Sequence, residues 1–194
     1  MLVFGFETLW RTYAKQVRSL SGRLGFKRGF LEFLGYVLNL DSGKVYDKIE
    51  NAYMENPETL YILLAHYSKA ESVKHVGKLL RFRDLLGGYA YEEAFLQRAV
   101  LPIAETFGGS PKILVKAAEI LGGIKCQFGD VSVEIPAFPK VPLIYVLWKG
   151  DDELQPSVSI FFDFSANNYL PTEDPAVLAE LATLRLTLIA QCER

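Results

Sequence analysis

The sequence predicts an α+β fold, with a mainly antiparallel sheet from an N-terminal hairpin and C-terminal strands, a helical middle and a C-terminal helix. Two observations support this prediction. Short apolar runs bounded by turn residues lie toward the two ends of the chain, whereas apolar residues at helical spacing fill the middle. Strands that are separated from helices in this way favour an antiparallel sheet over a wound parallel one.

The N-terminal region predicts one helix and one hairpin. Over residues 6–20, Leu9, Tyr13 and Val17 recur at four-residue steps with basic residues between them, which is typical of an amphipathic helix. Residues 30–46 contain apolar runs that lead into and out of Asp41-Ser42-Gly43. Because this tripeptide is a turn signal, the segment predicts a β-hairpin.

The middle third predicts helices with clear start and stop signals. Asn56-Pro57 and Ser110-Pro111 each place a capping residue before a proline, which suits the first helical position. Gly122-Gly123 ends the second of these helices. Residues 91–107 predict a helix between them, which Pro102 should kink or split because proline lacks a backbone N–H group.

The C-terminal third predicts a run of strands and a final helix. The helix begins at Asp174, as an N-cap residue, with Pro175 at the first helical position. Its predicted apolar stripe consists of Val177, Leu181, Leu184 and Leu188. The predicted strands are residues 124–128, 131–135, 143–148 and 158–163.

One common core should contain the large apolar residues of these stripes and strands. Truncation of any large one to alanine should cost about 2–5 kcal/mol. The predicted core residues are Leu63, Leu64, Phe82, Phe95, Leu114, Val146, Trp148, Ile160, Phe162, Leu181 and Leu184.

Composition restricts the class of protein. The 194 residues are 50% hydrophobic, which suits a single domain over residues 1–194. A net charge of −2 does not fit a nucleic-acid partner. Cys126 and Cys192 lack a paired spacing and predict two free thiols. The first ten residues lack a basic leader and no apolar run approaches about 18–20 residues, so we expect no membrane span and a cytoplasmic location. The oligomeric state is left open.

The chain resembles the family called domain of unknown function 3786 over roughly residues 30–185. Spaced groups of residues in a fixed order carry the resemblance. In the middle of the chain they are His66-Tyr67, Gly77-Lys78, Phe82-Arg83-Asp84-Leu85, Gly87-Gly88, Tyr91, Phe95 and Arg98. Toward the C-terminus they are Gly129-Asp130, Leu147-Trp148, Gly150-Asp151, Glu153, Phe162-Asp163, Ser165-Ala166, Tyr169-Leu170 and Glu173-Asp174.

The resemblance implies little about activity, because the family has none assigned. Some members look fused to a four-cysteine iron–sulfur segment, which implies redox or corrinoid-linked partners in anaerobic prokaryotes. This chain lacks that segment, so the resemblance implies no cluster of its own. The chain also departs from the family pattern at Leu154-Gln155, Ser68 and Leu79, so ligand specificity does not follow from the resemblance.

Acidic residues form the first candidate site. Asp151, Glu153 and Asp163, with Asp152, Glu173 and Asp174 nearby in sequence, could hold Mg²⁺ or Ca²⁺ or act as an acid–base pair. The alternative is structural: Gly-Asp-Asp is a turn sequence, and Asp174 caps a helix.

Arginines form the second candidate site. Arg83 and Arg98 could clamp a carboxylate or a phosphate, or could pair with internal carboxylates instead. We expect both to lie close to Asp151 and Asp163 in one polar seam. His66 predicts a hydrogen-bonded structural histidine, because His75 is the one other histidine and a zinc site needs more ligands.

These observations favour a non-catalytic binding or accessory module, and the family resemblance implies an association with redox or corrinoid-linked proteins. The alternative is an enzyme that uses the acidic cluster with a divalent metal ion. The expected partner is a protein or a small acidic ligand; no catalytic residue, resident metal or cofactor is identified. The candidate ligand-binding residues are Arg83, Arg98, Asp151, Glu153 and Asp163.

Overall fold

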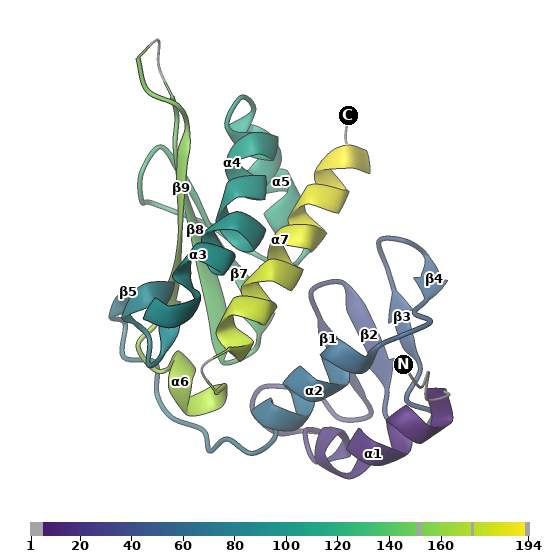
Figure 1. The fold of residues 1–194 in the computed structure, drawn as a ribbon. Helices are drawn as coiled ribbons and strands as arrows, with labels where there is room; N and C mark the ends of the chain where they lie inside the picture. Colours follow the sequence, from purple (N-terminus) through teal and green to yellow (C-terminus); the bar gives the residue numbers. More distant parts are fainter. Residues whose placement is uncertain (1–5, 151–152, 172, 193–194) are drawn as a thin grey trace.

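Two antiparallel sheets and the helices around them build the fold (Figure 1). The computed structural model describes residues 6–150, 153–171 and 173–192. The α+β class, the N-terminal hairpin and the C-terminal helix are confirmed. The hairpin belongs to a four-stranded sheet of its own, and the C-terminal strands form a separate five-stranded sheet.

The N-terminal unit consists of the four-stranded sheet and two helices. The predicted turn at residues 41–43 joins β2 to β3, and the Asn39 side chain accepts hydrogen bonds from the Asp41 and Ser42 N–H groups there. A second tight turn at Leu34-Gly35, which the sequence did not reveal, joins β1 to β2. The elements are α1 (Phe6–Arg18), β1 (Phe30–Phe33), β2 (Tyr36–Asn39), β3 (Val45–Asp47), β4 (Ala52–Tyr53) and α2 (Glu58–Tyr67).

The five-stranded sheet has the strand order β5-β9-β8-β7-β6 and is antiparallel throughout. Four of its strands were predicted, whereas the short edge strand β5 was not. Tyr145 pairs with Val133 on one side and Ile160 on the other, and all three side chains enter the core. The strands are β5 (Leu79–Arg81), β6 (Ile124–Cys126), β7 (Val131–Phe138), β8 (Val141–Trp148) and β9 (Ser157–Asp163).

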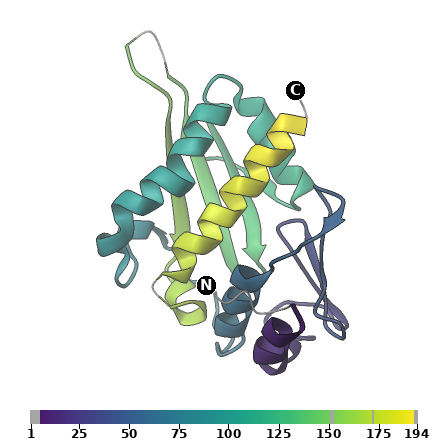
Figure 2. The same ribbon diagram turned by 45° about the vertical axis from the view of Figure 1, so that its right-hand side comes forward.

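Helices cover one face of this sheet (Figure 2). Two 3₁₀ turns, η1 (Phe82–Asp84) and η2 (Gly88–Tyr91), follow β5, and the short helix α6 (Ala166–Tyr169) follows β9. The covering helices are α3 (Glu92–Phe95), α4 (Leu101–Phe107), α5 (Pro111–Ile120) and α7 (Asp174–Cys192).

The predicted kink at Pro102 takes the form of a π-helical segment, η3 (Leu96–Val100), between α3 and α4. Proline cannot donate the helical hydrogen bond, and the wider π turn accommodates this loss. Thr183 of α7 donates its hydroxyl to the carbonyl of Ala99 in this segment at 2.8 Å. The irregular stretch is therefore fixed against α7.

The last helix, α7, buries a different stripe from the predicted one. Leu184 is 48% exposed, whereas Leu178, Ala182 and Leu186 are buried. By length and mean hydropathy of 1.3, α7 is apolar enough to cross a membrane, so the expectation of no membrane span stays a prediction. Half of that stretch is buried inside the protein, and a core helix passes the same test.

Most of the predicted core is confirmed. Leu63, Leu64, Phe82, Phe95, Leu114, Ile160 and Phe162 lie in one buried cluster, and Leu181 packs against it half-buried. Val146 is buried outside that cluster. Trp148 is 39% exposed because it ends β8 on the face without helices, so its assignment to the core was wrong, as was that of Leu184.

We expect Gly88→Ala to destabilise the protein by about 1–3 kcal/mol, because a Cβ atom at this position would lie 1.9 Å from the carbonyl oxygen of Phe82. Gly109→Ala is the matched control, since its Cβ would meet no atom within 4 Å. Chemical denaturation of both variants measures the difference. Equal stabilities would contradict the close packing of η2 on η1.

Candidate functional site

The predicted acidic residues do not gather at one place. Asp151 lies outside the described residues, and Glu153 is exposed in the loop between β8 and β9. Asp163 ends β9, which starts at Ser157. A strand of this length spans roughly 20 Å, so Glu153 and Asp163 lie at opposite ends of it.

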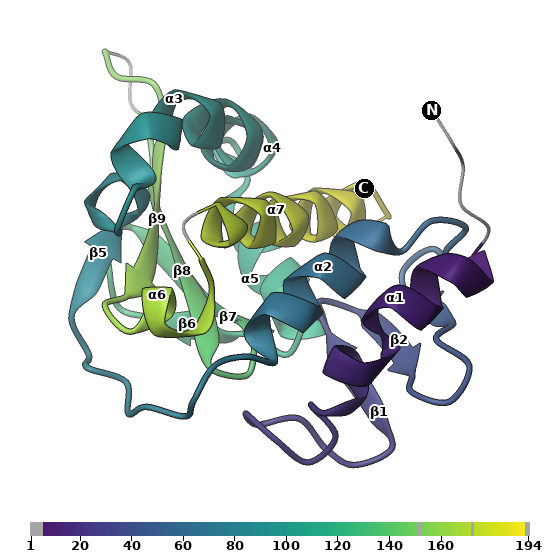
Figure 3. The same ribbon diagram turned by 60° about the horizontal axis from the view of Figure 1, so that its bottom comes forward.

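Asp163 is buried and has internal partners. Its carboxylate accepts hydrogen bonds from the N–H groups of Val76 (3.1 Å), Gly77 (2.7 Å) and Ser165 (2.9 Å), and from the Ser165 hydroxyl (2.5 Å). Burial alone would raise the pKa of Asp163, but these hydrogen bonds outweigh it and hold the pKa below its usual value. The side chain therefore fixes the connection between α2 and β5, residues 68–78, which runs along the outside of the molecule (Figure 3).

Arg83 and Arg98 pair with carboxylates other than the predicted ones. Arg83 lies 3.3 Å from Glu92, and Arg98 lies 3.9 Å from Glu180. Both ion pairs are solvent-exposed and of low energetic weight. Within the described residues, neither arginine forms an ion pair with Asp163, so that part of the predicted polar seam is not found. The part that involves Asp151 lies outside the described residues. Whether these side chains bind a ligand stays a prediction.

His66 is a hydrogen-bonded structural histidine, as predicted. Its Nδ1 lies 2.7 Å from the carboxylate of Asp174, which joins α2 to the start of α7. Asp174 is not the N-cap residue, because the Val177 N–H group bonds to the carbonyl of Glu173 and the cap lies one residue earlier. Burial raises the pKa of Asp174 above its usual value, although the hydrogen bond and the charge of His66 act in the opposite direction.

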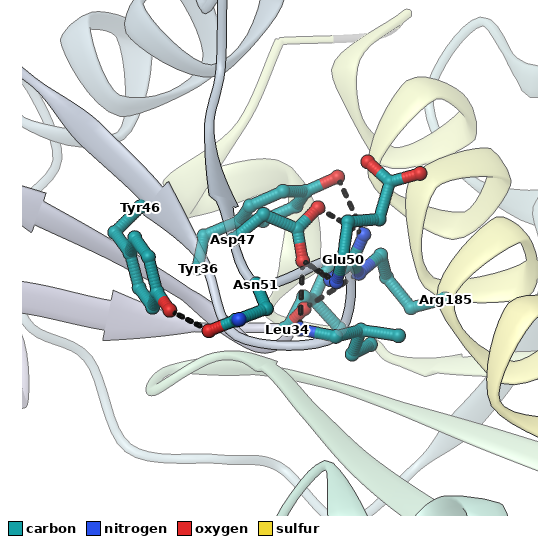
Figure 4. A network of polar contacts seen from close by, with 8 residues as sticks. Leu34, Tyr36, Tyr46, Asp47, Glu50, Asn51 and Arg185 are labelled. Carbon is teal, nitrogen blue, oxygen red and sulfur yellow. Dashed lines mark hydrogen bonds and ion pairs between the residues drawn. The ribbon is translucent and has the colours of Figure 1, made fainter.

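A buried ion pair joins the N-terminal unit to α7 (Figure 4). The guanidinium group of Arg185 donates two hydrogen bonds to the carboxylate of Asp47, one of them at 2.7 Å. It also donates to the carbonyl of Leu34 at 3.1 Å and stacks 4.3 Å from the ring centroid of Tyr36. The side chains of Arg185 and Asp47 are 1% and 3% exposed.

Asp47 has further partners inside its own turn. Its carboxylate accepts hydrogen bonds from the N–H groups of Ile49 and Glu50. Burial alone would raise the pKa of Asp47, but the hydrogen bonds from Arg185, Glu50 and Ile49 outweigh it, so the pKa lies below its usual value. Hydrogen bonds with protein groups therefore replace the contacts with water that both charges lose on burial.

A cavity of about 570 Å³ lies beside this ion pair at the junction of the two sheets. Its walls come from the β1–β2 turn, the segment after β3, the end of α5, the end of β7 and the last turn of α7. Most of the wall is apolar, and the charged lining residues are Glu32, Lys48 and Glu119. The lining residues are Glu32, Phe33, Leu34, Gly35, Lys48, Ile49, Glu119, Ile120, Leu121, Gly122, Pro136, Pro139, Ile189 and Cys192.

Two features fix the shape of this cavity. Gly35 lies directly over the guanidinium group, because a Cβ atom there would be 3.4 Å from Arg185 Nη2 and 3.3 Å from Ile49. Glu32 and Lys48 form an ion pair at the rim. The buried Arg185–Asp47 pair therefore holds the N-terminal wall in place, and the solvent-exposed rim pair shapes the opening without adding much stability.

The sequence analysis missed this junction completely. The available signal was Arg185 in the run Leu184-Arg185-Leu186, a charge inside an apolar helix that calls for a buried partner. Its partner Asp47 lies 138 residues away in the chain, so no local pattern connects the two. Both cysteines are free thiols, as predicted.

Three described carboxylates of the predicted metal cluster, those of Asp163, Glu173 and Asp174, have different partners. Asp163 holds backbone N–H groups, Asp174 holds His66, and Glu173 accepts a hydrogen bond from the Tyr91 hydroxyl. Among the residues that the structure describes, no group of three or more His, Cys, Asp or Glu side chains is placed to hold a metal ion.

Comparison with known proteins gives one match. The family model described as domain of unknown function (DUF3786) matches residues 25–185, which is most of the chain. No curated protein and no solved structure matches significantly.

We expect Asp47→Asn to destabilise the protein by about 3–5 kcal/mol, because it leaves the charge of Arg185 buried without a counter-ion. Adding Arg185→Met should recover part of this loss, since the asparagine oxygen can still accept from Ile49 and Glu50. Glu180→Gln, which breaks the exposed pair with Arg98, should cost at most about 1 kcal/mol. Urea denaturation measures all three variants; a double variant less stable than Asp47→Asn would contradict the interpretation.

Asp163 should make stability depend on pH. Because its folded pKa is lowered, its contribution is present above the unfolded value of about 3.9 and is lost as the pH falls through the folded value. Asp163→Asn should cost about 1–3 kcal/mol at neutral pH and should weaken the decline in acid. Denaturation over a pH series tests this, with the exposed Asp41→Asn as control. An acid decline as steep in Asp163→Asn as in the unaltered protein would count against it.

Proposed function

We propose that this chain, which belongs to the family described as domain of unknown function (DUF3786), binds a ligand at the junction of its two sheets. The proposed function is binding without catalysis. The ligand is a small, largely apolar organic molecule. The observation that carries this proposal is the cavity of about 570 Å³, because small-molecule sites are typically about 300–1,000 Å³, mostly apolar and placed between structural units.

The arrangement of the walls supports binding without rearrangement. Segments from the N-terminal unit and from the ends of α5 and α7 form opposite sides of the cavity. The Arg185–Asp47 ion pair fixes these sides relative to one another. A site that is already ordered loses less conformational entropy when a ligand enters, which favours affinity.

The charged groups at the cavity restrict the chemistry of the ligand. Among the described lining residues, Lys48 is the one basic side chain, and it is paired with Glu32. Glu119 adds a further negative charge. A strongly acidic ligand would have to displace Glu32 from Lys48, so a neutral or weakly polar molecule suits this cavity better than the small acidic ligand expected from the arginines.

Two wider expectations remain proposals of their own. An association with redox or corrinoid-linked proteins rests on the family resemblance, and a cytoplasmic location rests on sequence composition. The alternative of a metal-dependent enzyme would need carboxylates that gather in a cleft. The described carboxylates have separate partners instead, which favours the binding function.

We expect Ile120→Trp to weaken binding of the neutral apolar dye Nile red about tenfold or more, because Ile120 lines the cavity and the larger side chain fills it. Ile120 is 56% exposed, so the change should leave the fold intact. Fluorescence titration measures the affinity.

Leu184→Trp is the matched control for this titration. Leu184 is 48% exposed on α7 and does not line the cavity. The Leu184→Trp variant should bind Nile red with the same affinity as the unaltered protein. Equal loss of binding in both variants, or in neither, would contradict a site at the junction. Native mass spectrometry of the purified protein would then identify any natural ligand.

A further inference from the structure

The five-stranded sheet has a second face that carries no helix in the described part of the chain. The helices α4, α5 and α7 pack together on the core face (Figures 2 and 3). Residues alternate between the two faces along each strand, so the residues that precede and follow a core residue in its strand point away from these helices. One row of directly paired residues crosses all five strands on this open face: Arg81, Phe161, Ile144, Glu134 and Ile124.

The middle of the open face is apolar and nearly flat. Ile144 and Val146 are 8% and 2% exposed, shielded by their neighbours, whereas Ile124 at the edge is 61% exposed. In the next row, Val146 pairs with Ser159 and Ser132. Trp148, at the end of β8, is 39% exposed, and its ring lies beside Gly129 in the turn between β6 and β7.

Two charges lie on opposite sides of this apolar middle. Arg81 is on β5 and Glu134 is on β7, three strand spacings or about 14 Å apart, so they cannot pair within one chain. Neither has an ion-pair partner among the described residues. A two-fold axis that runs along the strands between β9 and β8 would place β5 of one copy opposite β7 of the other. Arg81 would then face Glu134 of the second copy, and this contact would occur twice.

The same rotation matches shapes as well as charges. Trp148 on β8 pairs in register with Ser157 on β9. The two-fold axis lies between these strands, so each Trp148 would lie over Ser157 of the other copy. By the same relation Ile144 would meet Phe161. In this arrangement the large Trp148 side chain therefore meets a small side chain of the second copy, and Ile144 meets an apolar one.

We propose that the open face of the five-stranded sheet is a docking surface for a second copy of this chain. The face carries one basic and one acidic group in self-complementary positions, which favours a second copy over a partner of a single charge sign. Four strands and about seven residues of length give roughly 450 Å² of sheet per copy, or about 900 Å² in total. This area is smaller than the about 1,200–2,000 Å² of stable specific interfaces and suits a weak dimer whose population depends on concentration.

Charge reversal tests the pairing. Sedimentation velocity of the full chain at low salt should show a monomer–dimer equilibrium, and added salt should shift it toward the monomer. Arg81→Glu and Glu134→Arg should each weaken dimerisation about tenfold or more, because each places like charges opposite one another. The double variant should restore it. Lys15→Glu, the same kind of charge change on the exposed side of α1, should leave it unaltered.

Fluorescence gives a second measurement. The chain has two tryptophans, of which Trp10 is 7% exposed and Trp148 is 39% exposed. Emission should move to shorter wavelength as concentration rises, and Trp148→Phe should abolish this change. Circular dichroism checks that each variant is folded. A chain that is monomeric at all concentrations, or a dimer indifferent to both reversals, or a double variant as weak as the single ones, would overturn the proposal.

Discussion

The ion pair between Arg185 and Asp47 sets the position of one half of the molecule relative to the other. It joins α7 to the four-stranded sheet across 138 residues of chain. Two charges that are nearly inaccessible to water lose several kcal/mol of hydration each, and only good geometry offsets this. The geometry is good here: Asp47 accepts from Arg185 and from its own turn, and Arg185 also donates to the Leu34 carbonyl. Any other docking that buried these two charges apart from one another would leave them unpaired, so this interaction disfavours such alternatives as well as stabilising the observed arrangement.

Three further polar contacts join segments that are distant in sequence. His66 holds Asp174, Asp163 holds the N–H groups of Val76 and Gly77, and the Tyr169 hydroxyl contacts both backbone groups of Val73. Five of these residues belong to the spaced groups through which the chain resembles its family: His66, Gly77, Asp163, Tyr169 and Asp174. Their partners are all internal. These polar residues of the family pattern therefore fix the connection between α2 and β5 and the start of α7. Their presence in the pattern does not by itself mark a catalytic centre.

Local patterns predicted the elements well and the long-range contacts poorly. Punctuation by Asp41–Gly43, Pro102 and Gly122-Gly123 identified real turns and helix interruptions, because those residues act through their own backbone. The prediction of the buried side of α7 was wrong because that helix is apolar nearly all round, so the spacing of its apolar residues does not show which side is buried. Leu184 is exposed, whereas Arg185 beside it is buried. The edge strand β5 is three residues long and too short to show a period. The expected pairing of the arginines with Asp163 is not found for a different reason: Glu92 and Glu180, which lie nearby, pair with Arg83 and Arg98 instead.

The same reasoning explains why the proposed binding site has no sequence signature. Its walls come from five segments, and each contributes residues such as Leu34, Ile120 and Pro136 that would be ordinary at any surface turn or helix end. What makes them a site is their mutual distance, which the buried ion pair sets. Hydrophobic residues of similar volume could replace such a pair with little or no loss of stability, so stability alone is a weak explanation for it. A fixed spacing between two units that enclose a cavity is a stronger one. Apolar contacts are non-directional and tolerate sliding, whereas a bidentate arginine–carboxylate contact holds only one distance and one angle.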